Sequence, residues 1–147
     1  MIAIDASVAV EWYLPDRTAP VARAALLEVA RSGAAVPGNF WAETLQALLR
    51  SARRRRVEHG EFAGAVAHLA GLDIVVSFPA LSQITAIAET YSLSAYDAGY
   101  LAVAKQRGLH VATLDDALSE AAKAEGCLWS PPPADEVEKR FSLLLAG

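Results

Sequence analysis

Short runs of β-branched and other apolar residues alternate with longer segments rich in alanine and leucine, and this alternation limits the fold more than any other feature of the sequence. We expect strands over residues 1–5, 34–37, 73–76 and 109–113, and a fifth, short strand over 127–129. Strands that alternate with helices pair in parallel and are covered by helices on both faces. The sequence therefore predicts an α/β fold, a three-layer α/β/α domain with a central, mostly parallel sheet of about five short strands.

The segments between the expected strands carry apolar residues at helical spacing, and several of them end at glycine or proline. The first expected helix carries Val8, Val10 and Trp12 and ends at Pro15, and we expect Asn39 to cap the third. The remaining helices are expected over residues 18–32, 39–56, 61–70, 81–88, 96–107, 116–124 and 135–144. Because the chain has 147 residues and neither an internal repeat nor a low-complexity linker, we expect a single domain over residues 1–147.

Composition excludes several classes of protein. The net charge of −4 excludes a generic basic coat for nucleic acid, although it leaves room for a local basic patch. The single cysteine excludes an intramolecular disulfide and a cysteine-rich zinc site. No apolar run approaches the length of a membrane-spanning helix, and no basic leader precedes an apolar block at the N-terminus. We therefore expect a cytoplasmic protein with no membrane partner.

Acidic residues gather where expected strands end and the following helices begin. Asp5 closes the first strand, Glu43 follows the second strand, Asp97 lies in the first turn of a helix, and Asp115 and Asp116 follow the fourth strand. In an open parallel sheet the carboxyl ends of the strands form one edge, and ligands bind there. Several carboxylates that share one site do not all stay ionised without a compensating cation. Oxygen ligands of this kind select Mg²⁺ or Mn²⁺.

Each of these acids also has a structural interpretation. Asp97 stands three residues after Ser94, and Asp116 stands three residues after Thr113, which is the spacing of a capping box. For Asp116 we favour the helix cap over a catalytic role. Asp97 shares a helix face with apolar residues, an unusual position for a solvated acid, whereas a helical wheel alone predicts that Glu43 is exposed.

Four segments of the sequence carry a family resemblance. They are Ile4-Asp5-Ala6-Ser7-Val8 running on to Trp12 and Asp16, Val36-Pro37 with Trp41 and Glu43, residues 93–102 around Tyr96-Asp97-Ala98, and Thr113-Leu114-Asp115. Through these segments, which span residues 1 to about 118, the chain resembles the PIN-domain ribonucleases, specifically the VapC-type toxins of bacterial toxin–antitoxin pairs. Two positions depart from the usual pattern of this subgroup: Gln46 stands where an asparagine is common, and Gly38-Asn39 is an unusual lead into the Glu43 helix.

The resemblance implies an endoribonuclease that depends on Mg²⁺ or Mn²⁺. It implies that the metal-binding and catalytic acids are Asp5, Glu43, Asp97 and Asp115, with hydrogen-bonding support from Ser7 and Thr113. Since Asp116 directly follows Asp115, the fourth position stays open by one residue. The resemblance also implies an RNA substrate, a homodimer and a cognate VapB-type antitoxin.

The run Arg53, Arg54, Arg55 and Arg56 has two interpretations of equal weight. The arginines contact RNA phosphates or an acidic partner, or they complement the dipole at the end of a helix.

Two rival functions follow from the same strand order. A phospho-accepting protein, either a receiver or a haloacid-dehalogenase-type phosphatase, also has an aspartate after the first strand. The phosphatase needs a second acid where this chain has Ser7, and the receiver needs an acidic pair and a late lysine that are missing here. The other rival is a non-catalytic PIN-like module that binds RNA or protein, which only an activity measurement separates from a nuclease.

Overall fold

The structure is a computed structural model that describes residues 1–15, 19–54 and 59–147. Within them, four strands form one parallel sheet in the order β3-β2-β1-β4. The strands are β1 (Ile2–Ile4), β2 (Ala34–Pro37), β3 (Ile74–Ser77) and β4 (Val111–Ala112). The predicted α/β fold with a parallel sheet is confirmed.

The prediction of a fifth strand over residues 127–129 is wrong. Leu128 forms a single parallel bridge with Val111, and the segment does not extend the sheet further. Residues 131–133 are three prolines, which have no backbone N–H to donate to a strand ladder, so the chain leaves the edge of the sheet after one bridge.

The helices lie close to the expected positions. They are α1 (Ala6–Glu11), α2 (Pro20–Ser32), α3 (Phe40–Arg53), α4 (His59–Gly71), α5 (Leu81–Tyr91), α6 (Ala95–Arg107), α7 (Asp116–Ala124) and α8 (Ala134–Ala146). The expected continuation of the third helix through residues 55 and 56 falls outside the described residues. None of the helices in the described residues has both the length and the apolar character needed to cross a membrane.

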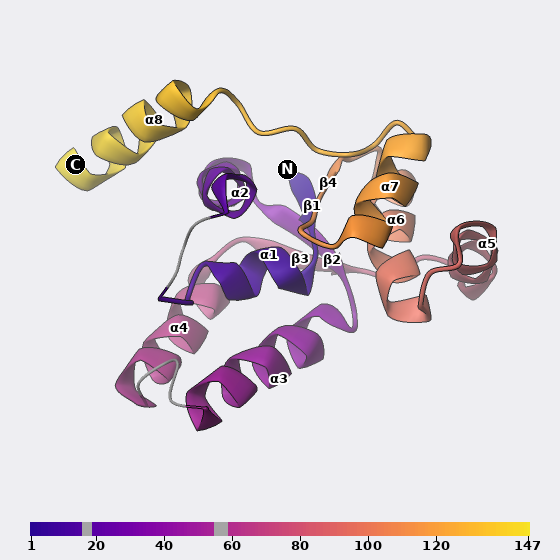
Figure 1. Cartoon of the computed structure of the whole chain (residues 1–147), viewed down its shortest axis with the longest axis horizontal. Coiled ribbons are helices and arrows are strands. Elements are labelled where there is room, and N and C mark those ends of the chain that lie inside the picture. The colour runs from indigo at the N-terminus through magenta and orange to yellow at the C-terminus, as the bar shows by residue number, and fades with distance from the viewer. Residues whose placement is uncertain (16–18, 55–58) are drawn as a thin grey trace.

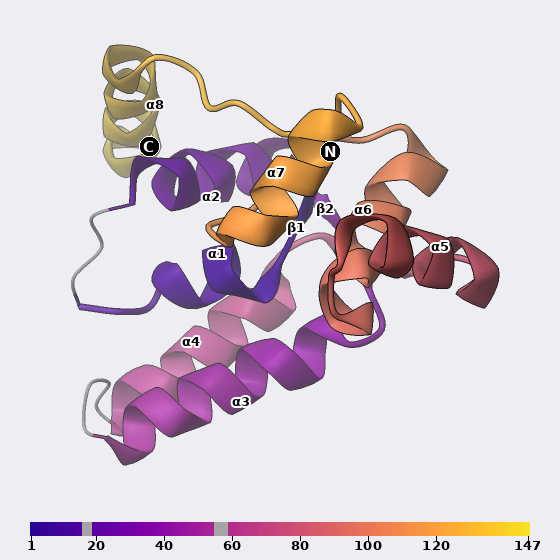
Figure 2. The ribbon, with the colours of Figure 1, turned by 45° about the vertical axis from the view of Figure 1, so that its right-hand side comes forward.

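Helices cover the sheet on both sides (Figure 1). Helix α6 packs against β2, β1 and β4, and α2 packs against β1 and β4. Figure 2 shows α1, α3 and α4 grouped on one side of the molecule and α5 and α6 on the other. Every residue of α6 from Ala98 to Ala104 is buried, because α6 lies between the sheet and the helices α5 and α7. Its small alanines allow this close approach, and the result fixes α6 firmly against the strands.

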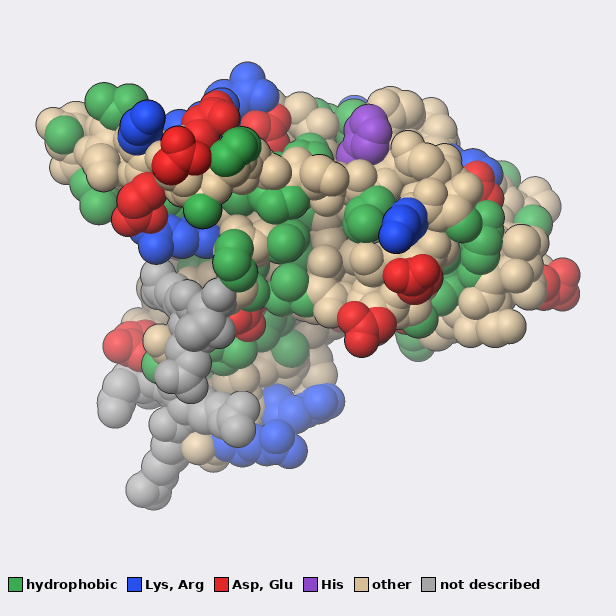
Figure 3. Space-filling model, turned by 45° about the horizontal axis from the view of Figure 1, so that its top comes forward, with side chains coloured by type: hydrophobic (Ala, Val, Ile, Leu, Met, Phe, Trp, Pro, Cys, Tyr) green, Lys and Arg blue, Asp and Glu red, His purple; other side chains and the backbone are tan. Residues whose placement is uncertain are grey.

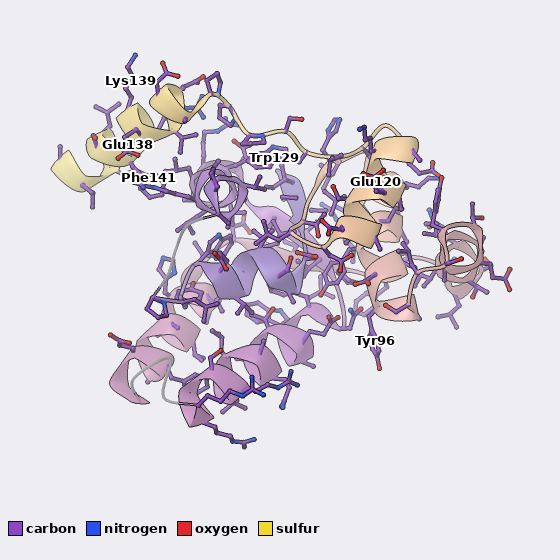
Figure 4. The ribbon with its side chains drawn as sticks, viewed as in Figure 1. Tyr96, Glu120, Trp129, Glu138, Lys139 and Phe141 are labelled. Carbon is purple, nitrogen blue, oxygen red and sulfur yellow. The ribbon has the colours of Figure 1, made fainter. Side chains whose placement is uncertain are left out.

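Helix α8 packs on α2 at the outside of the domain. The Arg23 guanidinium lies 4.4 Å from the centre of the Phe141 ring and 3.2 Å from Oε2 of Glu138. Figure 4 shows Phe141 on the side of α8 that faces α2, with Lys139 on the opposite side. This helix is remote from the carboxyl ends of the strands, where the acidic residues lie.

Candidate active site

Asp5 is the centre of the hydrogen bonds at the carboxyl edge of the sheet. It follows β1 directly and caps α1, where its Oδ1 accepts a hydrogen bond from the Val8 backbone N–H at 3.2 Å. Oδ1 also accepts from the Ser7 hydroxyl at 2.6 Å, and Oδ2 accepts from the Thr113 hydroxyl at 2.6 Å. The residue is 4% exposed. Burial raises the pKa of Asp5 from 3.8 to about 6, against the lowering effect of these three hydrogen bonds.

Ser7 and Thr113 connect the ends of the neighbouring strands β1 and β4. The Ser7 hydroxyl accepts from the Leu114 backbone N–H at 3.1 Å, and the Thr113 hydroxyl accepts from the Asp115 backbone N–H at 3.0 Å. Each hydroxyl therefore donates to Asp5 and accepts from the loop after β4. The position of that loop, and with it Asp115, is thereby fixed relative to Asp5.

Asp115, and not Asp116, caps α7. Oδ1 of Asp115 accepts from the Leu118 backbone N–H at 2.8 Å, while Asp116 is the first residue of the helix and is exposed. The prediction that Asp116 is the cap is therefore wrong. Its spacing from Thr113 matches a capping box, but the Thr113 hydroxyl bonds to Asp5 and to the Asp115 N–H instead of capping the helix.

Asp97 lies half-buried in the first turn of α6. The expected cap of this helix is present, since the Ser94 hydroxyl accepts from the Asp97 backbone N–H at 3.1 Å. Burial raises the pKa of Asp97, and the charges of Asp115 and Glu43 raise it further. The charge of Asp97 in turn raises the pKa of Asp5. Asp97 is therefore electrostatically linked to each of the other three acids, although the four come from distant parts of the chain.

Glu43 is not the exposed glutamate that the helical wheel predicts. It is half-buried in the first turn of α3, and its Oε1 accepts from the Tyr100 hydroxyl at 3.1 Å and from the Asn39 side-chain amide. Asn39 occupies the N-cap position of α3, as expected, but its side chain makes no capping hydrogen bond. The predicted capping role is wrong, because the backbone of Asn39 is helical (φ −78°, ψ −11°) and not extended as at a usual N-cap. The amide nitrogen donates to the Glu43 carboxylate.

Sequence reasoning did not identify Tyr100 and Asn39 as hydrogen-bond partners of Glu43. The available signals were that Asn39 stands one helical turn before Glu43 and that Tyr100 stands one turn after Asp97.

No cationic side chain neutralises these acids within the described residues. The ion pairs there are Arg23–Glu138, Arg31–Glu28, Lys105–Glu125 and Arg140–Glu136, all elsewhere in the fold. In the same residues, no group of three or more acidic, histidine or cysteine side chains forms a ready-made metal site. The donor chemistry nevertheless fits a hard divalent cation, because carboxylate oxygens without a protein counter-ion lie at one edge of the sheet.

A groove leads away from the acids between α1 and α3. Its lining includes Ser7 and Glu43 at one end and Gln46 and Arg50 further along α3, and its volume is about 410 Å³. Arg53 and Arg54 are exposed at the end of α3, whereas Arg55 and Arg56 fall outside the described residues. Figure 3 shows basic side chains gathered where α3 ends. The groove thus leads from Glu43 to a basic end at Arg50, and its lining also includes the acid Glu11 of α1.

The sequence profile of the PIN domain matches residues 2–124. The chain belongs to the PIN domain family. PIN domains are typically nucleases. The match ends before α8 begins.

A solved structure with the same fold as this PIN domain is the crystal structure of PAE2754 from Pyrobaculum aerophilum. The two chains are 21% identical, and their superposition has a TM-score of 0.60 and covers 96% of this chain and 95% of the other. At this identity the likeness concerns the fold alone. A comparison with curated proteins gave no match.

Proposed function

We propose that this PIN domain is an endoribonuclease that depends on Mg²⁺ or Mn²⁺ and acts as the VapC-type toxin of a toxin–antitoxin pair. The observation that carries the proposal is the set of four acids, Asp5, Glu43, Asp97 and Asp115. The charges of Glu43 and Asp115 raise the pKa of Asp97, the charge of Asp97 raises that of Asp5, and none of the four has a cationic partner among the described residues. A divalent cation is the group that relieves such repulsion.

The four acids would hold the cation, and their side chains differ in how firmly the protein fixes them. Asp5 is fixed by three hydrogen bonds, Asp115 is fixed as a helix cap, and Asp97 and Glu43 are half-buried at the starts of α6 and α3. When bound, the cation would lower the pKa of a water molecule and polarise a phosphodiester oxygen. Because like charges repel when no cation is present, we expect these side chains to draw together around the ion.

We also propose that the groove between α1 and α3 receives the RNA strand. Its lining contains both Glu43 and, two turns along the same helix, Arg50, and the exposed Arg53 and Arg54 continue this basic end. A guanidinium group binds phosphate oxygens with paired hydrogen bonds. Charge complementarity therefore supports the binding of RNA phosphates by these arginines over their alternative role as partners of the helix dipole. An acidic segment of a partner protein is the competing occupant of the groove.

The test of nuclease activity is incubation of the purified protein with total RNA in Mn²⁺, in Mg²⁺ and in chelator, with the ends of any fragments mapped. We expect cleavage in either metal, none in chelator, and none with Asp97→Asn. Asp116→Asn is the matched control, because it changes the same chemical group at an exposed position, and it should cleave normally. Binding of RNA without cleavage in any metal would favour the non-catalytic PIN-like module.

The toxin role is tested in cells. Expression without a partner should arrest growth, and Asp5→Asn should relieve the arrest at equal levels of soluble protein. Arrest that persists with folded Asp5→Asn would refute a nuclease toxin. The expected VapB-type antitoxin, homodimer and cytoplasmic location belong to the same proposal. Exposed apolar side chains at the start of α5 and just before it, Phe78 and Leu81, are consistent with a protein partner at that surface.

A further inference from the structure

We propose that Asn39 and Tyr100 are positioning residues for the metal site, which together hold one carboxylate oxygen of Glu43 and leave the other free for the cation. The inference rests on the proposed function, since it concerns the same metal. Neither residue belongs to the set of acids, and each acts through Glu43 and does not contact the ion.

Two donors from different elements meet on one oxygen atom. The Tyr100 hydroxyl on α6 donates to Oε1 of Glu43 at 3.1 Å, and the Asn39 amide at the start of α3 donates to the same Oε1. A carboxylate oxygen offers about two lone-pair sites, so these two donors use the acceptor capacity of Oε1. Among the described residues, Oε2 has no hydrogen-bond partner. The arrangement therefore turns a flexible glutamate into a ligand with one oxygen fixed and one available.

Tyr100 is a rigid donor. Its side chain is 1% exposed in the middle of α6, which packs on three strands, so the ring has no room to turn away. Burial raises the pKa of Tyr100, as do the charges of Glu43 and Asp5, which keeps the hydroxyl protonated and able to donate. The phenol therefore fixes where Oε1 lies relative to α6, the helix that also carries Asp97.

The Asn39 side chain serves Glu43 and does not cap its own helix. It occupies the N-cap position of α3 without a side-chain capping bond. Gly99 of α6 lies against the same turn, where a Cβ atom would be 3.4 Å from Oδ1 of Asn39 and 3.5 Å from Cβ of Pro37. Both distances are ordinary van der Waals contacts, so α6 and the start of α3 lie against each other where Asn39 and Tyr100 reach the same oxygen.

The experiment measures Mn²⁺ affinity of the full chain by isothermal titration calorimetry, which does not depend on catalysis. Tyr100→Phe removes only the hydroxyl, and Asn39→Ala removes only the amide. We expect each variant to bind Mn²⁺ about 10-fold or more weakly, the usual effect of removing a group that orients a metal ligand. Tyr91→Phe is the matched control, because its hydroxyl donates to Glu125 at 2.6 Å in the same way but away from the acids. It should bind Mn²⁺ like the wild-type protein.

A double-mutant cycle separates positioning from a general effect on the fold. In a Glu43→Ala background, neither Tyr100→Phe nor Asn39→Ala should weaken Mn²⁺ binding further. Further weakening there would mean that they act through another group, and the inference would be refuted. The inference would also be refuted if both single variants bound Mn²⁺ as tightly as the wild-type protein does, and the proposed metal site would then be unaffected. A wild-type protein that binds no Mn²⁺ would overturn the proposed metal site itself, and the positioning role with it.

Discussion

In the absence of metal, the unfolding free energy of the wild-type protein should fall as the pH rises from about 4 to about 6, and Asp5→Asn should remove most of that fall. Burial raises the pKa of Asp5 from 3.8 to about 6. Between these two values the folded protein binds one more proton at this residue than the unfolded chain does. Its unfolding free energy therefore decreases with pH, and the stability that the protonated form provides is lost above a pH of about 6.

The magnitude follows from the size of the change. Each pKa unit corresponds to about 1.36 kcal/mol, so the rise to about 6 corresponds to about 3 kcal/mol of unfolding free energy. Asparagine has the shape of the protonated aspartate and carries no charge. Asp5→Asn should therefore be more stable than the wild type above neutral pH by up to about 3 kcal/mol, and nearly equal to it near pH 4.

The assay is urea denaturation in chelator at a series of pH values, with Asp116→Asn as a control for general pH effects on the exposed rim. The difference between Asp5→Asn and wild type should grow with pH, and the control should follow the wild type. Addition of Mn²⁺ should restore the unfolding free energy of the wild-type protein at high pH and should not change that of Asp5→Asn. A difference that stays constant with pH, or that favours the wild type as the pH rises, would refute the assignment of a buried, destabilising charge to Asp5.

Three other predictions concern the metal, the two acids after β4 and the Trp12 hydrogen bond. Millimolar Mn²⁺ should raise the melting temperature, because a ligand that binds only the folded state stabilises it, and Asp97→Asn should reduce the rise; an equal rise would exclude Asp97 as a ligand. Asp115→Asn should reduce the rate of RNA cleavage by orders of magnitude at unchanged stability, since asparagine caps a helix as well as aspartate does. Asp116→Ala should retain cleavage and change the unfolding free energy by no more than about 0.5 kcal/mol. The opposite pattern would assign the fourth acid to Asp116. Trp12→Phe should lower the unfolding free energy by about 1–3 kcal/mol, because the indole N–H donates to the buried Ala22 carbonyl at 2.7 Å; an unchanged urea midpoint would mean that this bond contributes nothing.

Much of the candidate site was accessible from chain order. A residue just after a buried parallel strand lies at the carboxyl edge of the sheet. Asp5 directly follows β1, and Asp115 stands three residues after the end of β4. Helical periodicity was a poor guide to Glu43, because the wheel describes a helix in isolation. The side chain is half-buried because α6 brings Tyr100 to it from 57 positions away in the sequence.

The sequence by itself determined the alternation of strands and helices, the parallel sheet and the edge at which the acids lie, because apolar periodicity and the breaks at glycine and proline act over a few residues. The tertiary structure decided how each polar group was used. The Thr113 hydroxyl donates to Asp5 and accepts from the Asp115 N–H, and the cap of α7 is Asp115. Hydrogen bonds between side chains depend on which elements pack together, and only the folded chain fixes that.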